Sequence, residues 1–152
     1  MQANRAESDL EVRLRRRVWE FGGRGYRIHY RLAGRPDLAF PRAKVAVFVN
    51  GCFWHRCPRC ALSEPKANAV FWREKFRATA LRDRRARASL ESAGWSVMVV
   101  WECDIRSDIA RAARSVTCSV ANALMARAAS LPQSRFLAKA PGDEPRGVTP
   151  VG

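Results

Sequence analysis

Two short, unbroken apolar segments most constrain how this chain can fold. They read "KVAVFVN" (residues 44–50) and "WSVMVVW" (residues 95–101), with apolar side chains at successive positions rather than at alternate ones. Runs of this length and pattern are typical of strands that are buried on both faces. We therefore predict that 44–50 is a central strand of a sheet and that 95–101 is a second buried strand.

Three other segments have the pattern of helices. Residues 8–21 place apolar side chains at helical spacing, with arginines on the remaining faces. Ser8 and Glu11 match a capping box at the start of this segment, and two glycines follow its end. Residues 69–92 form a long Arg-rich segment that Gly94 closes, and residues 107–129 are rich in alanine.

Two further strands are expected before the first long apolar run. "YRIHY" (26–30) alternates large apolar and polar residues, and "DLAF" (37–40) follows the turn "AGRP". The order helix, three strands, helix, strand, helix predicts an α/β layer, a mixed sheet flanked by helices. We expect a flexible N-terminus (1–7), one folded domain (8–130) and a Pro-rich, disordered tail (131–152).

The charge of the chain indicates a polyanionic partner. Twenty-eight Lys and Arg residues face fourteen Asp and Glu residues, which gives a net charge of +14. Such an excess favours nucleic acid as the partner, although a merely basic soluble protein is the alternative. The sequence has no signal-peptide pattern and no run of the ~18 apolar residues that a membrane span needs. We expect a cytoplasmic protein without a membrane partner, in which stable disulfides are rare.

The segment "GCFWHRCPRC" (51–60) contains metal-type ligands. Cys57 and Cys60 have the C-x2-C spacing with which two thiolates grip one zinc ion. Cys52 lies in the same loop, and Cys103 can complete a tetrahedral, structural site if the ends of the two apolar strands are adjacent. The alternative is a set of reduced cysteines that pack as small hydrophobic residues, which is the role we expect for Cys118 in the Ala-rich helix.

Three other residues are candidates for catalysis on the residues alone. His55 is either a zinc ligand or a general base held beside the metal loop, and the spacing does not separate these roles. Asp37 begins a strand, where nucleases hold Mg2+ through oxygen ligands, but the residues alone favour an aspartate that caps the turn after Pro36. For Glu11, the residues alone indicate a structural role in its capping box.

Four motifs taken together resemble one family. "GRPDLAF", "VFVNGCFWHRC", "FWREKF…RDRR" and "GWSVMVVWEC", in this order and spacing, are similar to the very-short-patch-repair (Vsr) DNA mismatch endonucleases. The resemblance runs from about Ser8 to Ile105. It implies a restriction-endonuclease-like fold and an enzyme that nicks double-stranded DNA 5′ to the thymine of a T·G mispair. Such mispairs arise when 5-methylcytosine is deaminated, and repair synthesis then replaces a short patch.

The resemblance also implies roles for individual residues. Asp37 would bind catalytic Mg2+ together with the backbone oxygen of Val49, His55 would be the general base, and Glu11 would order water. The structural zinc would be held by the cysteines, Cys52, Cys57, Cys60 and Cys103. The DNA contacts would come from the aromatic wedge and its neighbours, Phe53, Trp54, Trp72, Lys75 and Asn50. A wedge is physically reasonable because a mispair is easier to unstack than a matched pair.

Two positions depart from the family pattern. Asn50 stands where relatives often have Asp or His, and it cannot shuttle a proton. Thr79 stands where an Asn is usual, on the helix that would face the mispair. Two alternative functions therefore remain: a zinc-stabilised DNA-binding module without catalysis, and a nuclease of altered mismatch or site specificity. From the family we expect a monomer at the nucleoid, because one asymmetric lesion needs one reader.

Overall fold

A computed structural model describes residues 8–130 of the chain, and the expected flexible N-terminus (1–7) and Pro-rich tail (131–152) lie outside the described residues. Three helices and three strands make up this part of the chain. In sequence order they are α1 (Asp9–Glu20), β1 (Leu38–Phe40), β2 (Val45–Asn50), α2 (Ala69–Ser92), β3 (Ser96–Trp101) and α3 (Glu102–Ala129). The described part is thus a mixed α/β fold, as the element order predicted.

The sheet has the strand order β1-β2-β3, so β2 is the central strand, as the apolar run at 44–50 predicted. β1 pairs antiparallel with β2, with Leu38 opposite Val47. β2 pairs parallel with β3 over six residues, from Val45 opposite Ser96 to Asn50 opposite Trp101. The sheet is therefore mixed, and the parallel pair brings the carboxyl ends of β2 and β3 to one edge.

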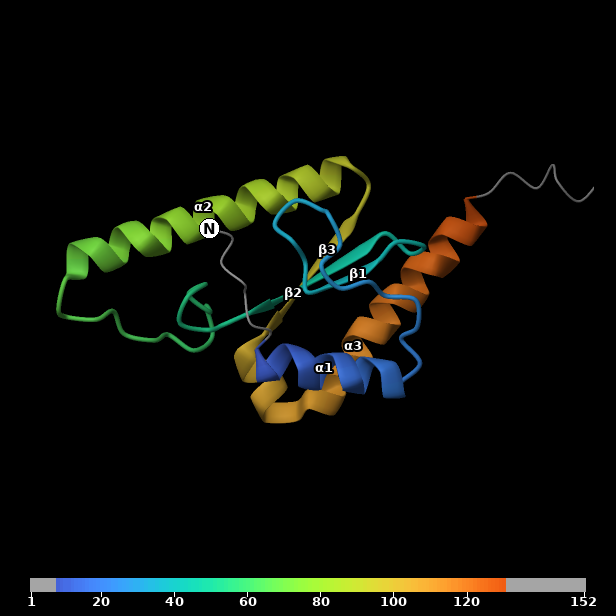
Figure 1. Ribbon diagram of the computed structural model, residues 1–152, viewed down its shortest axis with the longest axis horizontal. Helices are drawn as coiled ribbons and strands as arrows, with labels where there is room; N and C mark the ends of the chain where they lie inside the picture. Colours follow the sequence, from blue (N-terminus) through green and yellow to red (C-terminus); the bar gives the residue numbers. More distant parts are fainter. Residues whose placement is uncertain (1–7, 131–152) are drawn as a thin grey trace, which may run out of the picture.

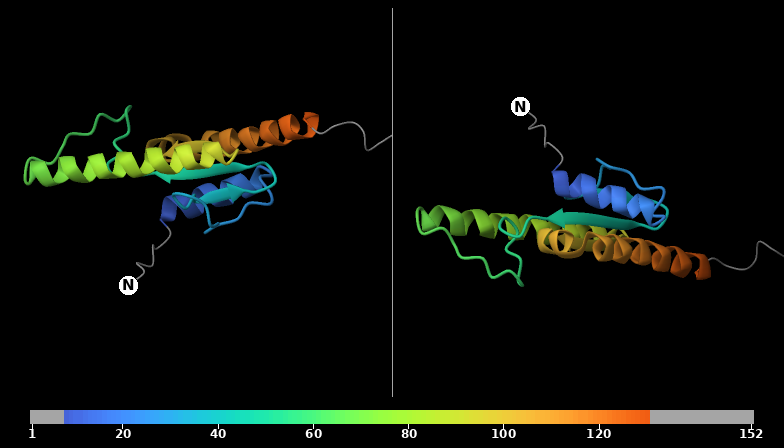
Figure 2. Two further views of the ribbon diagram at one scale, coloured as in Figure 1. Left: turned by 90° about the horizontal axis from the view of Figure 1, so that it is seen from above. Right: turned by 90° about the horizontal axis from the view of Figure 1, so that it is seen from below.

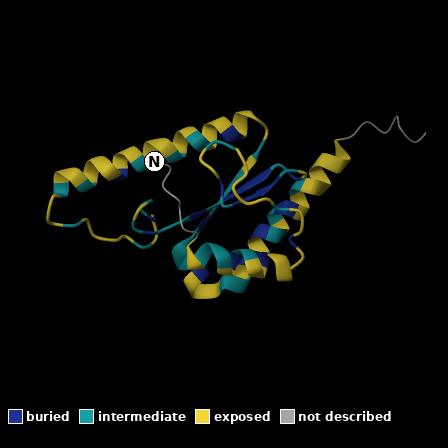
Figure 3. Ribbon diagram, in the orientation of Figure 1, coloured by how far each residue is buried: buried dark blue, intermediate teal, exposed yellow. Residues whose placement is uncertain are grey.

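The main core lies between the sheet and the pair of helices α1 and α3. Figure 1 shows the strands crossing the middle of the molecule, with α2 on one side and α1 together with α3 on the other. Alternate residues of β2, Val45, Val47 and Val49, pack in one cluster with Leu14 of α1 and Val116 of α3. The buried residues gather at these strands and at the facing sides of α1 and α3 (Figure 3).

The boundaries of α1 follow from local chemistry. The Ser8 hydroxyl accepts the Glu11 backbone N–H at 3.3 Å, which is the serine half of the predicted capping box, and it donates to the Glu11 carboxylate at 2.9 Å. Gly22, with a φ of 84°, takes the left-handed conformation just after the helix ends. The predicted start and end of α2 agree with the structure, and Gly94, also at positive φ, follows it.

The helices α2 and α3 extend beyond the sheet in opposite directions, as both views of Figure 2 show. Much of α2 is consequently exposed, and Phe76 and Leu90 are its buried residues. Among the helices of residues 8–130, none has the length and apolar character needed to cross a lipid bilayer.

Two strand predictions need correction. Residues 26–30 do not form a strand: Arg27 makes an isolated bridge to Ala39, and His29 has a φ of 52°, which breaks an extended backbone. β3 is present but is an edge strand, in which Val100 is the buried residue. An apolar run alone does not decide whether a strand has one neighbour or two.

The third helix begins five residues before the predicted start. α3 starts at Glu102, directly after β3, and the backbone of Asp108 (φ −154°, ψ 88°) interrupts it near its first turns. The Asp108 side chain accepts the backbone N–H of Arg111 at 2.9 Å, as an N-cap residue does. The predicted range 107–129 thus corresponds to the second, longer segment of α3.

Candidate functional site

The four cysteines predicted as zinc ligands lie together. Because Asn50 and Trp101 are opposite each other at the ends of parallel strands, the loop after β2 and the first turn of α3 begin side by side. The sulfur atoms of Cys52, Cys57, Cys60 and Cys103 all lie within 4.8 Å of one another. The Sγ atoms of Cys57 and Cys103 are 3.9 Å apart. The condition set by the sequence, adjacent strand ends, is therefore met.

This cluster fits a tetrahedral metal ion such as zinc. Zn–S bonds of about 2.3 Å in a tetrahedron require sulfur atoms about 3.8 Å apart, which is close to the Cys57–Cys103 separation. Burial raises the pKa of the Cys52 thiol to about 12. Burial acts in the same direction on Cys57, but backbone N–H groups of Arg59 and Cys60 outweigh it and lower the pKa of Cys57 to about 7. Metal uptake would therefore release protons from these thiols.

The first turn of α3 holds the cysteine loop through a carboxylate. Glu102 Oε2 accepts the backbone N–H of Cys52 at 3.1 Å, and Glu102 Oε1 accepts from Arg106 Nε at 2.9 Å. The Arg106 guanidinium and the Cys52 N–H keep the pKa of Glu102 below its ordinary value.

The fifth cysteine, Cys118, is exposed on α3, so the prediction that it packs in the core is wrong. Because alanines occupy several faces of this helix, its sequence does not show which face is exposed to solvent.

His55 does not belong to the cysteine cluster and instead pairs with a carboxylate. Its Nδ1 atom lies 2.5 Å from Asp83 Oδ2, and the exposed fractions of the two side chains are 16% and 37%. With Nδ1–H donated to the carboxylate, Nε2 is the ring nitrogen that can accept a proton. Asp83 lies on α2, 28 residues from His55. Sequence reasoning missed its role, since an aspartate among helical arginines has the pattern of an ordinary charged surface.

Asp37 lies against the backbone at the end of β2. Its Oδ2 atom accepts the Val49 N–H at 2.6 Å, while its own N–H donates to the Val47 carbonyl at 3.0 Å. In a strand the N–H and C=O of one residue point to the same side, so the Val49 carbonyl also points toward β1. A half-buried carboxylate and a backbone carbonyl on one side of a strand are oxygen donors of the kind that Mg2+ accepts.

The turn before Asp37 is held close to α2. Gly34 has a φ of 74°, and a Cβ atom placed on it would lie 2.7 Å from the Cβ of Ala86 and 3.1 Å from Phe48 Cε1. A glycine is required here by both conformation and space. The "GRPD" motif therefore places its aspartate by packing its glycine between α2 and β2.

Aromatic rings from the cysteine loop and from α2 form a cluster. Phe53 packs edge-on against Trp54, Trp72 and Phe76, with centroid separations of 5.2, 5.5 and 5.4 Å. Trp54 is 47% exposed, whereas Phe76 is buried. The neighbouring Phe71 of α2, 5.6 Å from Trp72, is also exposed. Phe53 thus forms the centre of the cluster and Trp54 its outer ring.

Cations border this aromatic cluster. Lys75 Nζ lies 5.1 Å from the Trp54 centroid and 5.7 Å from that of Trp72. The Arg56 guanidinium stacks over Phe76 at 4.7 Å. Exposed rings beside ammonium and guanidinium groups suit bases that stack and phosphates that pair with cations. Phe76 and Arg56 were missed from the sequence, where nothing separates them from core and surface residues.

The remaining predicted residues are not joined to these groups. Glu11 makes its described contacts with Ser8, at the start of α1. Asn50 is the half-buried last residue of β2, and Thr79 is half-buried on α2. Within residues 8–130, the cysteines form the one group of three or more metal-ligating side chains, so Glu11, Asp37 and His55 do not form another.

The described part is thus a basic α/β fold with a four-cysteine cluster, a His–Asp pair and an exposed aromatic surface. A family model described as "DNA mismatch endonuclease Vsr" matches residues 1–61. The chain is 36% identical over 107 residues to the type II nicking enzyme V.XorIIP of Xanthomonas oryzae pv. oryzae, covering 69% of this chain and 78% of that enzyme. The chain belongs to the Vsr family.

Two further relatives agree with this assignment. The type II nicking enzyme V.NaeI of Lentzea aerocolonigenes is 41% identical over 109 residues, which cover 67% of this chain and 64% of that enzyme. The DNA mismatch endonuclease Vsr of Escherichia coli is 39% identical over 75 residues, 49% of this chain and 48% of that protein. The family and these relatives support a Vsr-like DNA endonuclease.

Proposed function

We propose that this chain is a Mg2+-dependent endonuclease that nicks one DNA strand 5′ to the thymine of a T·G mispair. The observation that carries the proposal is the pair formed by His55, in the loop after β2, and Asp83 of α2, whose Nδ1 and Oδ2 atoms are 2.5 Å apart. A histidine oriented by a carboxylate is suited to act as a general base. A DNA-binding module without catalysis has no need of such a pair.

The residues of the chain divide the reaction among them. Asp83 would hold the imidazole ring of His55 in one tautomer. The Nε2 atom would then take a proton from the attacking water while the water oxygen bonds to phosphorus. Asp37 and the Val49 carbonyl would hold Mg2+, which when bound supplies positive charge at the scissile phosphate. Glu11 would order water beside this ion. The bond from phosphorus to the leaving deoxyribose oxygen breaks, and that oxygen is then protonated.

The aromatic cluster would supply the preference for a mispair. Of the three predicted wedge rings, Trp54 is the exposed one, and Phe53 and Trp72 pack against it. Unstacking a base step costs a few kcal/mol and less at a mispair, so a rigid wedge selects weak pairs. Lys75 and Asn50 would contact the DNA beside this wedge.

Zinc is the ion we propose for the cysteine cluster. Four thiolates leave no open position on a tetrahedral ion, so its role would be structural. It would fix the loop that carries Phe53, Trp54 and His55 before DNA arrives, which lowers the ordering cost of binding. With this surface preformed, a monomer of the protein can act on one asymmetric lesion.

The first experiment is a nicking assay on a labelled duplex with a single T·G mispair, with a matched duplex as control, with and without Mg2+. We expect one Mg2+-dependent cut 5′ to the mispaired thymine. Asp37→Asn should abolish the cut but keep DNA binding and zinc content. The control is Asp9→Asn, at a side chain that is 81% exposed on α1, and it should cut, bind DNA and hold zinc like the wild type.

Other outcomes would select the alternatives. Tight binding of the mispaired duplex without any cut would favour the non-catalytic binding module. Equal cutting of the mispaired and matched duplexes would support the endonuclease activity and contradict the mismatch specificity. A panel of all mispairs would then test for the altered specificity that Thr79 raises.

A further inference from the structure

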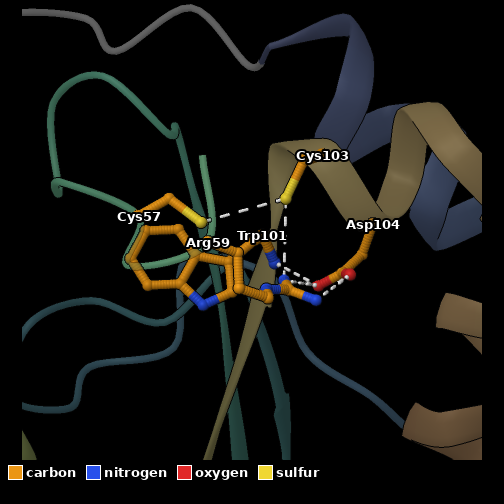
Figure 4. A network of polar contacts seen from close by, with 5 residues as sticks. All are labelled: Cys57, Arg59, Trp101, Cys103 and Asp104. Atoms are coloured by element: carbon orange, nitrogen blue, oxygen red, sulfur yellow. Dashed lines mark hydrogen bonds and ion pairs between the residues drawn. The ribbon is translucent and has the colours of Figure 1, made fainter. Parts of the chain in front are cut away.

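Arg59 lies between two of the clustered cysteines in the sequence and contacts a third in space. Its Nη1 and Nη2 atoms donate to Oδ1 and Oδ2 of Asp104 at 2.8 and 2.7 Å. Its Nη2 atom also lies 3.6 Å from the sulfur of Cys103. Figure 4 shows the guanidinium of Arg59 between this sulfur and the Asp104 carboxylate. One side chain thus reaches from the cysteine loop to a metal-ligating residue of α3.

The geometry differs from that of an ordinary surface ion pair. The two parallel N–H···O bonds form the fork arrangement that arginine makes with carboxylates, which fixes the plane of the guanidinium. Asp104 is fixed in turn, because it lies in the first turn of α3 and accepts the backbone N–H of Trp101 at 3.3 Å. The nitrogen that faces Cys103 is therefore held in place.

The negative charge of a zinc-loaded cysteine cluster would be stabilised by the contact between Arg59 and Cys103. Zinc with four thiolates carries a formal charge of −2, and the carboxylate of Glu102 beside Cys52 adds to the local negative charge. An N–H group that donates to a thiolate withdraws charge from the sulfur and orients it toward the ion. Arg59 keeps its positive charge at any pH that a folded protein tolerates.

We propose that Arg59 is a positioning residue of the four-cysteine metal centre, which stabilises the Cys103 thiolate through its N–H group while Asp104 holds it in place. The inference rests on the zinc proposed above for this cluster. It does not depend on the nicking reaction or on mismatch specificity. The loop carrying His55 and the first turn of α3 then become ordered together when the metal binds.

The test compares the zinc affinity of Arg59→Leu with that of the wild-type protein by competition with a chelator. Removing such an outer partner typically lowers metal affinity about 10–100-fold, and we expect a loss in that range. Arg17→Leu is the matched control, because Arg17 also pairs with a carboxylate, Glu20, at 2.6 Å but lies on α1, away from the cysteines. Its zinc affinity should equal that of the wild type.

A second readout reports on the sulfur itself. With Co2+ in place of zinc, the sulfur-to-cobalt charge-transfer band should shift to lower energy in Arg59→Leu, because the thiolate loses a hydrogen bond. Arg59→Lys should give an intermediate affinity, since an ammonium group keeps the charge without the fork. A residue that merely stabilises the fold would not move this band in metal-saturated protein.

Asp104→Asn tests whether the two side chains act as a unit. We expect a smaller loss of zinc affinity than in Arg59→Leu, and the double variant should lose no more than Arg59→Leu alone. The proposal fails if Arg59→Leu binds zinc within twofold of Arg17→Leu and leaves the cobalt band in place. It also fails if the wild-type protein binds no zinc, whatever the nicking assay shows.

Discussion

Replacement of Gly34 by alanine tests how the motif that carries Asp37 is held. At a φ of 74°, a residue with a Cβ atom is strained by about 1–2 kcal/mol. The new methyl group would also lie 2.7 Å from the Cβ of Ala86, where no flexible side-chain end can move aside. Overpacking of this kind costs about 1–3 kcal/mol. We expect Gly34→Ala to lower the free energy of unfolding by about 2–5 kcal/mol, the sum of both effects.

Two other glycines separate the two contributions. Gly25 has a similar φ of 78° but nothing within 4 Å of its added Cβ, so Gly25→Ala should lose only the conformational part. Gly23 is not at positive φ, but its added Cβ would lie 2.5 Å from Val18 Cγ1, so Gly23→Ala should lose only the steric part. The free energies come from urea unfolding at one pH with saturating zinc. Gly34→Ala should also slow nicking, because the turn that positions Asp37 must move.

The result that refutes this reasoning is specific. If Gly34→Ala is no less stable than Gly25→Ala, the contact between this turn and α2 is not tight in solution. The packing of Gly34 between Ala86 and Phe48 would then not be what positions Asp37. Normal nicking by a strongly destabilised Gly34→Ala would mean that the turn affects stability without setting the position of the carboxylate.

Three further predictions follow from the site. Asp83→Asn should lower the rate of nicking by about 10²–10⁴-fold with little change in DNA affinity, because His55 loses its orienting carboxylate; an unchanged rate would remove the pair from the reaction. A thiol reagent should modify Cys118 at once in the zinc-loaded protein and the other four thiols only after chelation, and immediate reaction of all five would contradict a metal-filled cluster. The lowered pKa values of Glu102 and Asp104 stabilise the fold at neutral pH, and this contribution is lost as the pH falls below about 4. The difference in unfolding free energy between wild type and Glu102→Gln should therefore shrink from pH 7 to pH 3, and a constant difference would rule out this linkage.

Local signals determined the elements that the sequence predicted correctly. The helices α1 and α2 depend on side-chain period, on the glycines that follow them and, in α1, on the Ser8 N-cap, all of which act within a few residues. The strand β2 has apolar side chains at successive positions and is central, as this pattern predicts. The cysteine cluster could be anticipated in the same way, since the C-x2-C spacing already suits two bonds to one ion.

The errors arose where a segment's neighbours decide its state. Residues 26–30 alternate like a strand, but a strand needs a partner, and this segment makes one bridge, Arg27 to Ala39. The apolar run of β3 resembles that of β2, yet β3 has a neighbour on one side. In the Ala-rich α3, side-chain period alone did not show that Cys118 faces solvent.

The sequence by itself determined a basic protein, an α/β order of helices and strands, ligands for a metal ion and rings for stacking. Tertiary structure alone decided which side chains meet. His55 and Asp83 are 28 positions apart, and Arg59 and Asp104 are 45 apart. Local pattern carries no information on such pairs, because they form only when α2 and the end of β3 are packed beside the cysteine loop. The parallel pairing of β2 with β3 brings Cys103 to the other three cysteines, and the docking of α2 supplies His55 with its carboxylate.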